Sequence, residues 1–263
     1  MNALVVYASS RGTTARVGEA IADGMMAAGA SASALSIDLL SMMPGRVETA
    51  DVIGIGSPIY FLREPEYVTS FVSQLPSLAG KRAFVFCTTG MDRVGETLYR
   101  LHRLVAERDG VVVGAESFRS AMSYYPYRMR GLGNPESLPD EEVLAAAHRF
   151  GERMAAADLA PVTPEPPSAS ARVKARLLAN RHFRRLVFPR VVLNRAACTG
   201  YGSCISRCPF QALERQDEEA IPELTSRCIQ CLECVDSCPR EAIVIDSRLR
   251  EWISTLSYRL RLH

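Results

Sequence analysis

The sequence lacks the features of several protein classes. No uncharged apolar run approaches the roughly 18 residues that a membrane helix needs. The first seven residues, MNALVVY, contain neither the basic region nor the small-residue cleavage site of a secretory signal peptide. A formal net charge of +2 is low for a nucleic-acid-binding protein, and the four histidines are too scattered to form a ligand cluster. We therefore expect a cytoplasmic, globular protein with no transmembrane segment and no nucleic-acid partner.

The length and charge pattern predict more than one domain. At roughly 150 residues per domain, 263 residues suggest two. The net charge of +2 hides four blocks, in which acidic segments alternate with basic ones. We place the boundaries accordingly: 1–157 is a first domain, 158–190 a Pro-rich and then basic linker, 191–247 a second domain, and 248–263 a basic amphipathic helix that docks on the protein or binds a partner or membrane surface.

The first domain shows an alternation of short apolar runs and amphipathic segments. Strands are predicted at 3–7, 51–56, 82–88 and 111–118, and helices at 16–28, 95–108 and 140–158. Short buried strands separated by helices are typical of a parallel α/β sheet covered on both faces. The fold class expected for this domain is therefore α/β with a doubly wound parallel sheet.

Seven of the eight cysteines lie between residues 198 and 238, and Cys87 stands alone in a predicted buried strand. Such clustering in a chain without a signal peptide favours metal ligation over disulfides. The spacing from Cys228 to Pro239 is C-x₂-C-x₂-C-x₃-C-P, in which three thiolates wrap one iron–sulfur cube and the fourth ligates a second cluster. A zinc ribbon would instead pair two C-x₂-C arms. Cys87 is interpreted as a core residue.

The cysteine-rich segment contains an internal repeat with an offset of 30 residues. Cys198, Cys204 and Cys208 match Cys228, Cys234 and Cys238, and a proline follows the last cysteine of each half. A repeat of this kind predicts a small domain with two related cluster sites. The segment resembles the bacterial two-cluster ferredoxins, which implies an α+β fold for it.

Tyr201 stands where the repeat would place a cysteine opposite Cys231. The crossed ligation of the ferredoxins then implies one complete [4Fe–4S] site, with Cys208, Cys228, Cys231 and Cys234. The second site retains Cys198, Cys204 and Cys238, which suits a [3Fe–4S] cluster or a [4Fe–4S] cluster with one non-cysteine ligand. Three roles are open for Tyr201. It packs beside a labile or absent cluster, it ligates the cluster through its phenolate oxygen, or it lies beside a three-iron cluster without ligating it.

A polar loop between the first strand and the first helix predicts a phosphate site. Backbone N–H groups at a helix N-terminus, together with hydroxyls, bind phosphate, although the hydroxyls alone could cap the helix. No Gly-Lys-Ser/Thr and no G-x-G-x-x-G occurs there, which disfavours a nucleotide P-loop and a dinucleotide fold. The loop comprises Ser9, Ser10, Arg11, Gly12, Thr13 and Thr14.

Two further loops follow the next strands of the predicted sheet. The carboxyl ends of parallel strands meet at one edge, where open α/β sheets bind ligands. These loops comprise Ser57, Pro58, Ile59, Tyr60 and Phe61, and Thr88, Thr89, Gly90 and Met91. The pattern over residues 1–157 resembles the flavodoxins, with Thr14 at their key threonine and Gly18 where they usually have alanine. This resemblance implies FMN as cofactor, with the three loops as its site.

The segment 119–139 is longer than a minimal flavodoxin needs and is rich in tyrosine and arginine. It covers the flavin, docks a partner, or is a surface loop with packed tyrosines. The whole chain resembles flavodoxin–ferredoxin fusion proteins, sometimes called ferrodoxins, which are mostly assigned as electron carriers. The resemblance implies an electron-transfer protein that relays electrons between FMN, iron–sulfur clusters and a redox protein partner. The alternatives are a flavin-dependent oxidoreductase acting on an organic substrate, and a redox sensor.

Overall fold

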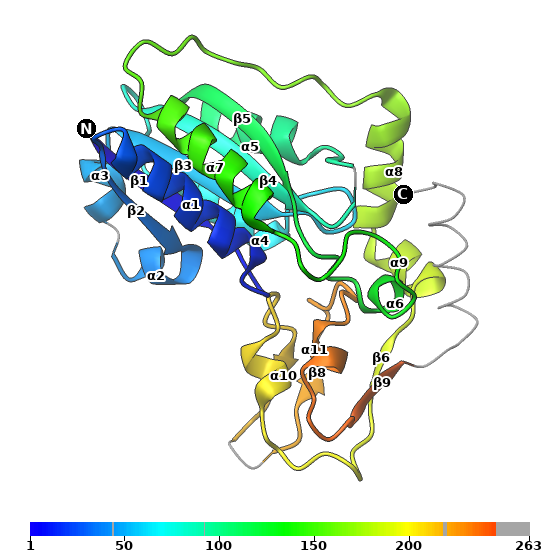
Figure 1. Cartoon of the computed structure of the whole chain (residues 1–263). Helices are drawn as coiled ribbons and strands as arrows, with labels where there is room; N and C mark the ends of the chain where they lie inside the picture. Colours follow the sequence, from blue (N-terminus) through cyan, green and yellow to red (C-terminus); the bar gives the residue numbers. More distant parts are fainter. Residues whose placement is uncertain (44, 92, 218–219, 246–263) are drawn as a thin grey trace. The chain divides into compact units, whose positions relative to one another are not determined.

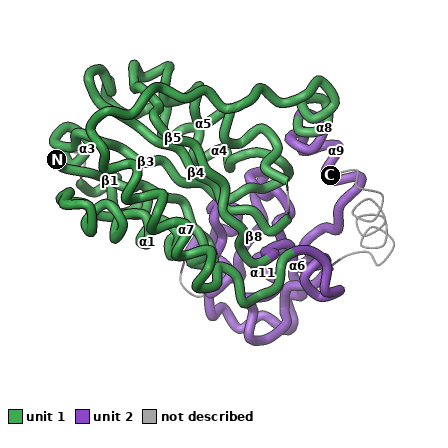
Figure 2. The backbone as a smooth tube through the Cα atoms, turned by 45° about the horizontal axis from the view of Figure 1, so that its top comes forward, with its two compact units in different colours: residues 1–121, 134–175 green, residues 122–133, 176–263 purple. Residues whose placement is uncertain are grey.

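The computed structural model describes residues 1–43, 45–91, 93–217 and 220–245 of the chain (Figure 1). The chain forms two compact units, shown in different colours in Figure 2. Unit 1 comprises residues 1–121 and 134–175, and unit 2 comprises residues 122–133 and 176–263. Each unit is described here by itself. The expected helix at 248–263 lies outside the described residues.

Unit 1 is built on a five-stranded parallel sheet with the strand order β2-β1-β3-β4-β5. This order confirms the predicted doubly wound α/β fold, in which the chain reverses direction beside β1. All four predicted strands are present within two residues of their expected ends. The strands are β1 (Asn2–Tyr7), β2 (Ser31–Ser36), β3 (Val52–Pro58), β4 (Arg82–Thr89) and β5 (Val111–Arg119).

Helices cover both faces of this sheet (Figure 1). Because side chains alternate along a strand, Leu4 and Val6 enter one apolar core while Ala3 and Val5 enter the other. Helices α1 and α7 close the second core, and α2, α3, α4 and α5 close the first. The helices are α1 (Thr13–Ala27), α2 (Ile37–Ser41), α3 (Gly45–Thr49), α4 (Glu66–Gln74), α5 (Thr97–Ala106) and α7 (Glu141–Met154).

Strand β2 and helices α2, α3 and α4 were not predicted from the sequence. The sequence of β2, SASALS, is an alternation of serine with small apolar residues and carries little of the β-branched or aromatic signal of a strand. It becomes a strand because it lies at the sheet edge and pairs in register with β1, from Asn2 with Ser31 to Tyr7 with Ser36. Tertiary pairing thus outweighs weak local preference.

Unit 2 contains short helices and two small antiparallel sheets, in which β6 pairs with β9 and β7 pairs with β8. Residues 155–168 form neither helix nor strand, and the division between the two units falls within α8. Helices α8 and α9 lie within 158–190, the segment expected from the sequence to be a linker. The elements are α6 (Tyr125–Arg128), α8 (Ala169–Ala179), α9 (Arg181–Val187), β6 (Val191–Leu193), α10 (Ser203–Ser206), β7 (Leu213–Glu214), β8 (Glu223–Leu224), α11 (Glu233–Asp236) and β9 (Ile243–Ile245).

The 30-residue repeat is visible in the structure of unit 2. Helix α10 and helix α11 are separated by this offset, as are the first residues of β7 and β9. Matching residues are also equally buried, since Cys204 and Cys234 are both 7% exposed. These two cysteines share a small core with Leu213 and Ile243, which are matched in the same way. The repeat therefore folds as two copies of one loop-and-helix unit around a common core.

Among the described residues, no helix combines the length and hydropathy that crossing a membrane requires.

Candidate functional site

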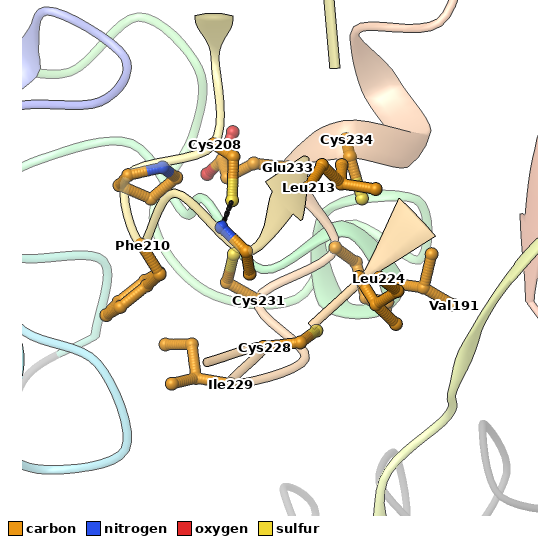
Figure 3. A pocket seen from close by; sticks show the side chains of 13 residues that line it. Val191, Cys208, Phe210, Leu213, Leu224, Cys228, Ile229, Cys231, Glu233 and Cys234 are labelled. Carbon is orange, nitrogen blue, oxygen red and sulfur yellow. Dashed lines mark hydrogen bonds between the residues drawn. The ribbon is translucent and has the colours of Figure 1, made fainter. Parts of the chain in front are cut away.

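One cavity in unit 2 is lined by four cysteines (Figure 3). These are Cys208 from the first half of the repeat and Cys228, Cys231 and Cys234 from the second. The remaining lining is mostly apolar and includes Val191, Phe210, Leu213, Leu224 and Ile229. This is the four-cysteine set that the crossed ligation of the repeat predicts, and we call it the complete site.

A second cavity is lined by the other three clustered cysteines, Cys198, Cys204 and Cys238. Tyr201 also lines it, and the rest of the lining includes Leu193, Pro222 and Ile243. Each cavity thus takes its cysteines from both halves of the repeat. We call this cavity the three-cysteine site.

Backbone N–H groups reach the same sulfur atom in each half of the repeat. The N–H of Ala212 donates to Cys208 Sγ at 3.2 Å, drawn in Figure 3, and that of Ala242 donates to Cys238 Sγ at 3.3 Å. Gln211 and Glu241, which precede these donors, have φ values of 46° and 49°. Hydrogen bonds to ligand sulfur atoms are one of the features by which a protein tunes an iron–sulfur cluster.

The ligand loops of the two halves also share an unusual backbone. Gln230 and Leu232 flank Cys231 with φ values of 64° and 65°. At the matching positions beside Tyr201, Gly200 and Gly202 have φ values of 72° and 81°. A left-handed residue on each side of the central position curls the loop tightly, which glycine does without strain. The loop around Tyr201 thus keeps the conformation of a ligand loop although the thiol is gone.

Burial raises the pKa of the thiols of Cys204, Cys228, Cys231 and Cys234. Neighbouring thiols raise the pKa further, Cys238 and Cys198 acting on Cys204, and Cys228 acting on Cys234. Ligated thiolates in these cavities therefore need a compensating positive charge, which iron supplies. Within the described residues, no three His, Cys, Asp or Glu side chains converge on a single ion. The donor sets suit a cluster, because each thiolate binds a different iron atom of a cube.

Charged side chains of two helices, α9 and α11, affect the complete site. The pKa of the Cys228 thiol is raised by burial and by Cys208, and lowered by the Gln230 N–H and the guanidinium groups of Arg184 and Arg185 in α9. Glu233, the first residue of α11, is 6% exposed and lines the cavity. Neither Arg184 nor Glu233 was among the residues expected from the sequence.

In unit 1, the three predicted loops meet at the carboxyl ends of β1, β3 and β4. Ser10 Oγ lies 2.8 Å from the hydroxyl oxygen of Tyr60, which joins the first loop to the second. Thr14 Oγ1 lies 2.8 Å from Thr88 Oγ1 in a buried contact, which joins the first loop to the third. The Ile59 N–H donates to the Thr88 carbonyl at 3.2 Å, which joins the second to the third. The sequence prediction that these loops come together is confirmed for these residues.

The first loop leads directly into α1. Gly12 has a φ of 79° and is the last residue before the helix. The Ser9 hydroxyl accepts a hydrogen bond from the Ala15 N–H at 3.3 Å. The loop thus places hydroxyl groups beside the positive end of a 15-residue helix, an arrangement that binds phosphate.

Asn134 is a residue of this region that sequence reasoning missed. Its side chain is 8% exposed, its Nδ2 donates to the Thr89 carbonyl at 3.0 Å, and its backbone N–H donates to the Gly90 carbonyl at 2.8 Å. Arg119 Nη2 donates to Asn134 Oδ1 at 3.1 Å. Asn134 therefore holds the third loop from outside it, and no local pattern in the sequence marks that role.

Comparisons with known proteins assign both parts of the chain. Residues 190–239 match the model of the 4Fe-4S dicluster domain, and residues 4–115 match that of the flavodoxin domain. The chain joins an N-terminal flavodoxin domain to a C-terminal 4Fe–4S dicluster ferredoxin domain.

Relatives of each domain are found separately. An uncharacterized protein of Methanocaldococcus jannaschii is 27% identical over 154 residues, which cover 58% of this chain and 97% of that protein. A ferredoxin of Methanothermococcus thermolithotrophicus is 33% identical over 42 residues, which cover 16% of this chain and 70% of that ferredoxin. The structure of a flavodoxin from the domain Archaea has a TM-score of 0.47 and 19% identity, covering 59% of this chain and 96% of that one.

One position in each domain bears on the assignment of the cysteines. Cys87, in β4 of the flavodoxin domain, is 0% exposed, and its burial raises the pKa of its thiol, so it is a core residue as predicted. Tyr201, in the ferredoxin domain, is 76% exposed, whereas its counterpart Cys231 is 9% exposed. The two halves of the ferredoxin domain therefore differ sharply in exposure at the position where the ligand is missing.

Proposed function

We propose that the protein is an electron carrier that relays electrons between FMN, its iron–sulfur clusters and a redox protein partner. The observation that carries this proposal is the pairing of a flavodoxin domain with seven free thiols that line two cavities of a ferredoxin domain. When bound, FMN exchanges one or two electrons and an iron–sulfur cluster exchanges one, so both on one chain form a relay. A cytoplasmic location is part of the same proposal.

In the ferredoxin domain, Cys208, Cys228, Cys231 and Cys234 would hold a [4Fe–4S] cluster. Cys198, Cys204 and Cys238 would hold a [3Fe–4S] cluster, or a [4Fe–4S] cluster with one non-cysteine ligand. The division of the cysteines between two cavities, four in one and three in the other, supports this assignment. The high exposure of Tyr201 favours a site with three thiolates over one closed by a buried phenolate.

In the flavodoxin domain, the loop from Ser9 to Thr14 would hold the FMN phosphate through its N–H groups and hydroxyls. The loops from Ser57 to Phe61 and from Thr88 to Met91 would flank the isoalloxazine ring. The contacts between these loops support a single site at the sheet edge. The chain's own contribution is to position the cofactor and to keep these loops closed on one another.

The first test is composition and paramagnetic resonance of protein purified without oxygen. We expect one FMN, seven iron atoms and eight sulfide ions per chain, on the basis of one [4Fe–4S] and one [3Fe–4S] cluster. The oxidised protein should show a three-iron signal, and the reduced protein a signal from one [4Fe–4S] cluster. Two ordinary reduced [4Fe–4S] signals would overturn the three-iron assignment, and absence of FMN would overturn the relay.

The second test separates a carrier from an enzyme. A carrier should reduce or oxidise a redox protein rapidly and leave small organic substrates unchanged. The reduced protein is mixed anaerobically with a panel of quinones, nitroaromatics and enones, and in parallel with an acidic and a basic ferredoxin. Catalytic turnover of an organic substrate with no protein partner present would overturn the carrier proposal in favour of an oxidoreductase.

A further inference from the structure

The second loop of the proposed FMN site ends in a tight hairpin turn. The Tyr60 N–H donates to the Arg63 carbonyl at 2.8 Å, and the Arg63 N–H donates to the Tyr60 carbonyl at 3.1 Å. The two residues between them, Phe61 and Leu62, have φ values of 52° and 67°. Positive φ at both central positions is typical of type I′ turns, which glycine and asparagine usually fill. We call residues 60–63 the left-handed turn, and its bulky central residues make this conformation costly.

The left-handed turn begins at a residue of the FMN site. The hydroxyl oxygen of Tyr60 lies 2.8 Å from Ser10 Oγ in the first loop. A change in the turn would therefore move Tyr60 and alter its contact with the phosphate loop. The proposed role of the second loop thus depends on whatever holds the turn in a conformation that its own sequence disfavours.

A buried carboxylate comes directly after the turn. The Glu64 side chain is 0% exposed, and its Oε1 lies 2.7 Å from Arg100 Nε in α5. The same oxygen accepts a hydrogen bond from the Thr69 hydroxyl of α4 at 3.0 Å. Among the described residues, Glu64 Oε2 has no hydrogen-bond partner. A carboxylate removed from water needs a cation close by, so the contact with Arg100 fixes the end of the turn to α5.

The turn also contacts the residues that precede α5. The Glu96 N–H donates to the Leu62 carbonyl at 3.0 Å, and Arg63 Nε lies 3.3 Å from Glu96 Oε2. Gly95 permits this close approach, because a Cβ on it would lie 2.3 Å from the Leu62 carbonyl oxygen. The N-terminal end of α5 therefore holds the turn through its backbone as well as through its side chains.

Another ion pair of α5 provides an internal comparison. Arg103 Nη2 lies 3.1 Å from Glu107 Oε1, and these side chains are 62% and 58% exposed. That pair joins positions i and i+4 of one segment and is screened by water, so little stability depends on it. The pair of Glu64 and Arg100 instead joins residues 36 positions apart, and its carboxylate is out of water. It is therefore suited to fix one segment against another.

We infer that Glu64 and Arg100 are positioning residues for FMN, which hold the left-handed turn and thereby keep the second loop in the shape that flanks the cofactor. The inference rests on the proposed FMN site. Neither residue was expected from the sequence, and both lie outside the three loops, so their effect on FMN passes through the turn. The residues concerned all belong to unit 1.

The test is the affinity of the full-length holoprotein for FMN. Anaerobic dilution releases FMN, and the rise of its fluorescence over a series of protein concentrations gives the Kd. We expect Glu64→Gln to raise the Kd about fivefold, and Arg100→Met to raise it about tenfold or more, because the second change leaves the buried carboxylate without its cation. The variant carrying both changes should bind no more weakly than Glu64→Gln alone, since its buried charge is gone.

A spectroscopic measurement separates positioning from a general loss of stability. The visible circular dichroism of protein saturated with FMN reports the surroundings of the ring, and we expect it to change in Glu64→Gln and Arg100→Met. Arg100→Lys keeps the cation, so it should keep the wild-type dichroism and a Kd within about threefold of wild type. The matched control combines Arg103→Met with Glu107→Gln, which removes the exposed pair and should leave both measurements unchanged.

A variant of the turn tests the conformational part of the inference. Leu62→Gly removes the cost of positive φ at that position, so the turn should depend less on the ion pair. In the Leu62→Gly background, Glu64→Gln should raise the Kd by less than about twofold. An equally large effect of Glu64→Gln in both backgrounds would contradict the claim that the pair holds the conformation of the turn.

The remaining outcomes also decide the matter. Wild-type affinity in both Glu64→Gln and Arg100→Met would overturn the inference, and so would weaker binding with wild-type dichroism, because reduced stability would then account for the loss. If Arg100→Met fails to fold, Glu64→Gln and the variant carrying both changes decide by the same criteria. A wild-type holoprotein that contains no FMN would instead overturn the proposed FMN site, and the inference with it.

Discussion

The two halves of the ferredoxin domain have the same backbone plan and different chemistry. Both contain a left-handed loop, a four-residue helix, and an alanine N–H that donates to the last cysteine. They differ where Tyr201 replaces Cys231 in the pattern, and where Ser206 replaces Asp236. The backbone of each half therefore does not depend on a full set of ligands, and the two sites differ in only a few side chains.

The loops also show how each half supports the same left-handed backbone conformation. The first half uses Gly200 and Gly202, which adopt positive φ at no steric cost. The second half uses Gln230 and Leu232, for which positive φ is costly. Leu232 is 1% exposed, and burial of its side chain offsets that cost. The loop of the complete site is therefore held by packing, and the loop of the three-cysteine site by glycine.

The largest effect is expected from removing the ligand that distinguishes the halves. Cys231→Ser should abolish the reduced [4Fe–4S] signal of the complete site or convert it to a three-iron signal, because the fourth thiolate is lost. Iron per chain should fall by at least one. Paramagnetic resonance and iron analysis measure this, with Cys87→Ala as the control that leaves both unchanged. A wild-type spectrum in Cys231→Ser would mean that the complete site is wrongly assigned.

The reverse change should make the halves alike. Tyr201→Cys restores a fourth thiolate on a loop that already has the ligand-loop backbone. We expect the three-iron signal of the oxidised protein to disappear and a second reduced [4Fe–4S] signal to appear, with one more iron per chain. Tyr201→Phe is the matched control, since it removes only the hydroxyl. Loss of iron in Tyr201→Phe would show that the phenolate is a ligand, contrary to the three-thiolate assignment.

A smaller effect is expected from the two neighbouring arginines of α9. Arg184 is 8% exposed and its Nη1 donates to the carbonyls of Leu178 and Ala179, while Arg185 is exposed. A buried cation near Cys228 stabilises the reduced cluster more than a screened one does. Arg184→Gln should lower the reduction potential of the complete cluster by about 60 mV, a tenfold change for one electron.

Two further variants complete this comparison in an anaerobic redox titration followed by paramagnetic resonance. Arg185→Gln should lower the potential less, because water screens that charge, and Arg184→Lys should keep most of the wild-type potential because it keeps the charge. Equal shifts in Arg184→Gln and Arg184→Lys would show that helix packing, and not charge, sets the potential.

The smallest effect is expected at the glycine loop. Gly202→Ala should weaken the ferredoxin domain by about 1 kcal/mol, because alanine disfavours positive φ. An added Cβ would approach Arg215 only at 3.4 Å, so space is not the limit. Anaerobic denaturation followed by loss of cluster absorbance measures the change. Gly202→Asn should cost less, since asparagine tolerates this conformation, and equal losses for alanine and asparagine would contradict the conformational explanation.

Much of the fold and of the candidate sites could be predicted because the signals are local. The strands β1, β3, β4 and β5 are short apolar runs, and the ligand cysteines follow a spacing that the geometry of a cluster imposes. Strand β2 escaped prediction because its serines and alanines carry little preference, and its pairing with β1 is a property of the sheet. Asn134 escaped because its partners Thr89 and Gly90 are distant in the sequence.

The sequence by itself determined which thiols are present, how they repeat, and that one half lacks a cysteine, because these are facts of residue type and spacing. Only the tertiary structure decided that residues 122–133 belong to the same unit as the ferredoxin domain, that the Arg184 guanidinium lowers the pKa of the Cys228 thiol, and that Tyr201 is exposed. The physical reason is that burial and charge pairing depend on segments far apart in the chain. Arg128 and Asp236 pair within unit 2 although they lie far apart in the sequence, and no spacing along the chain encodes that contact.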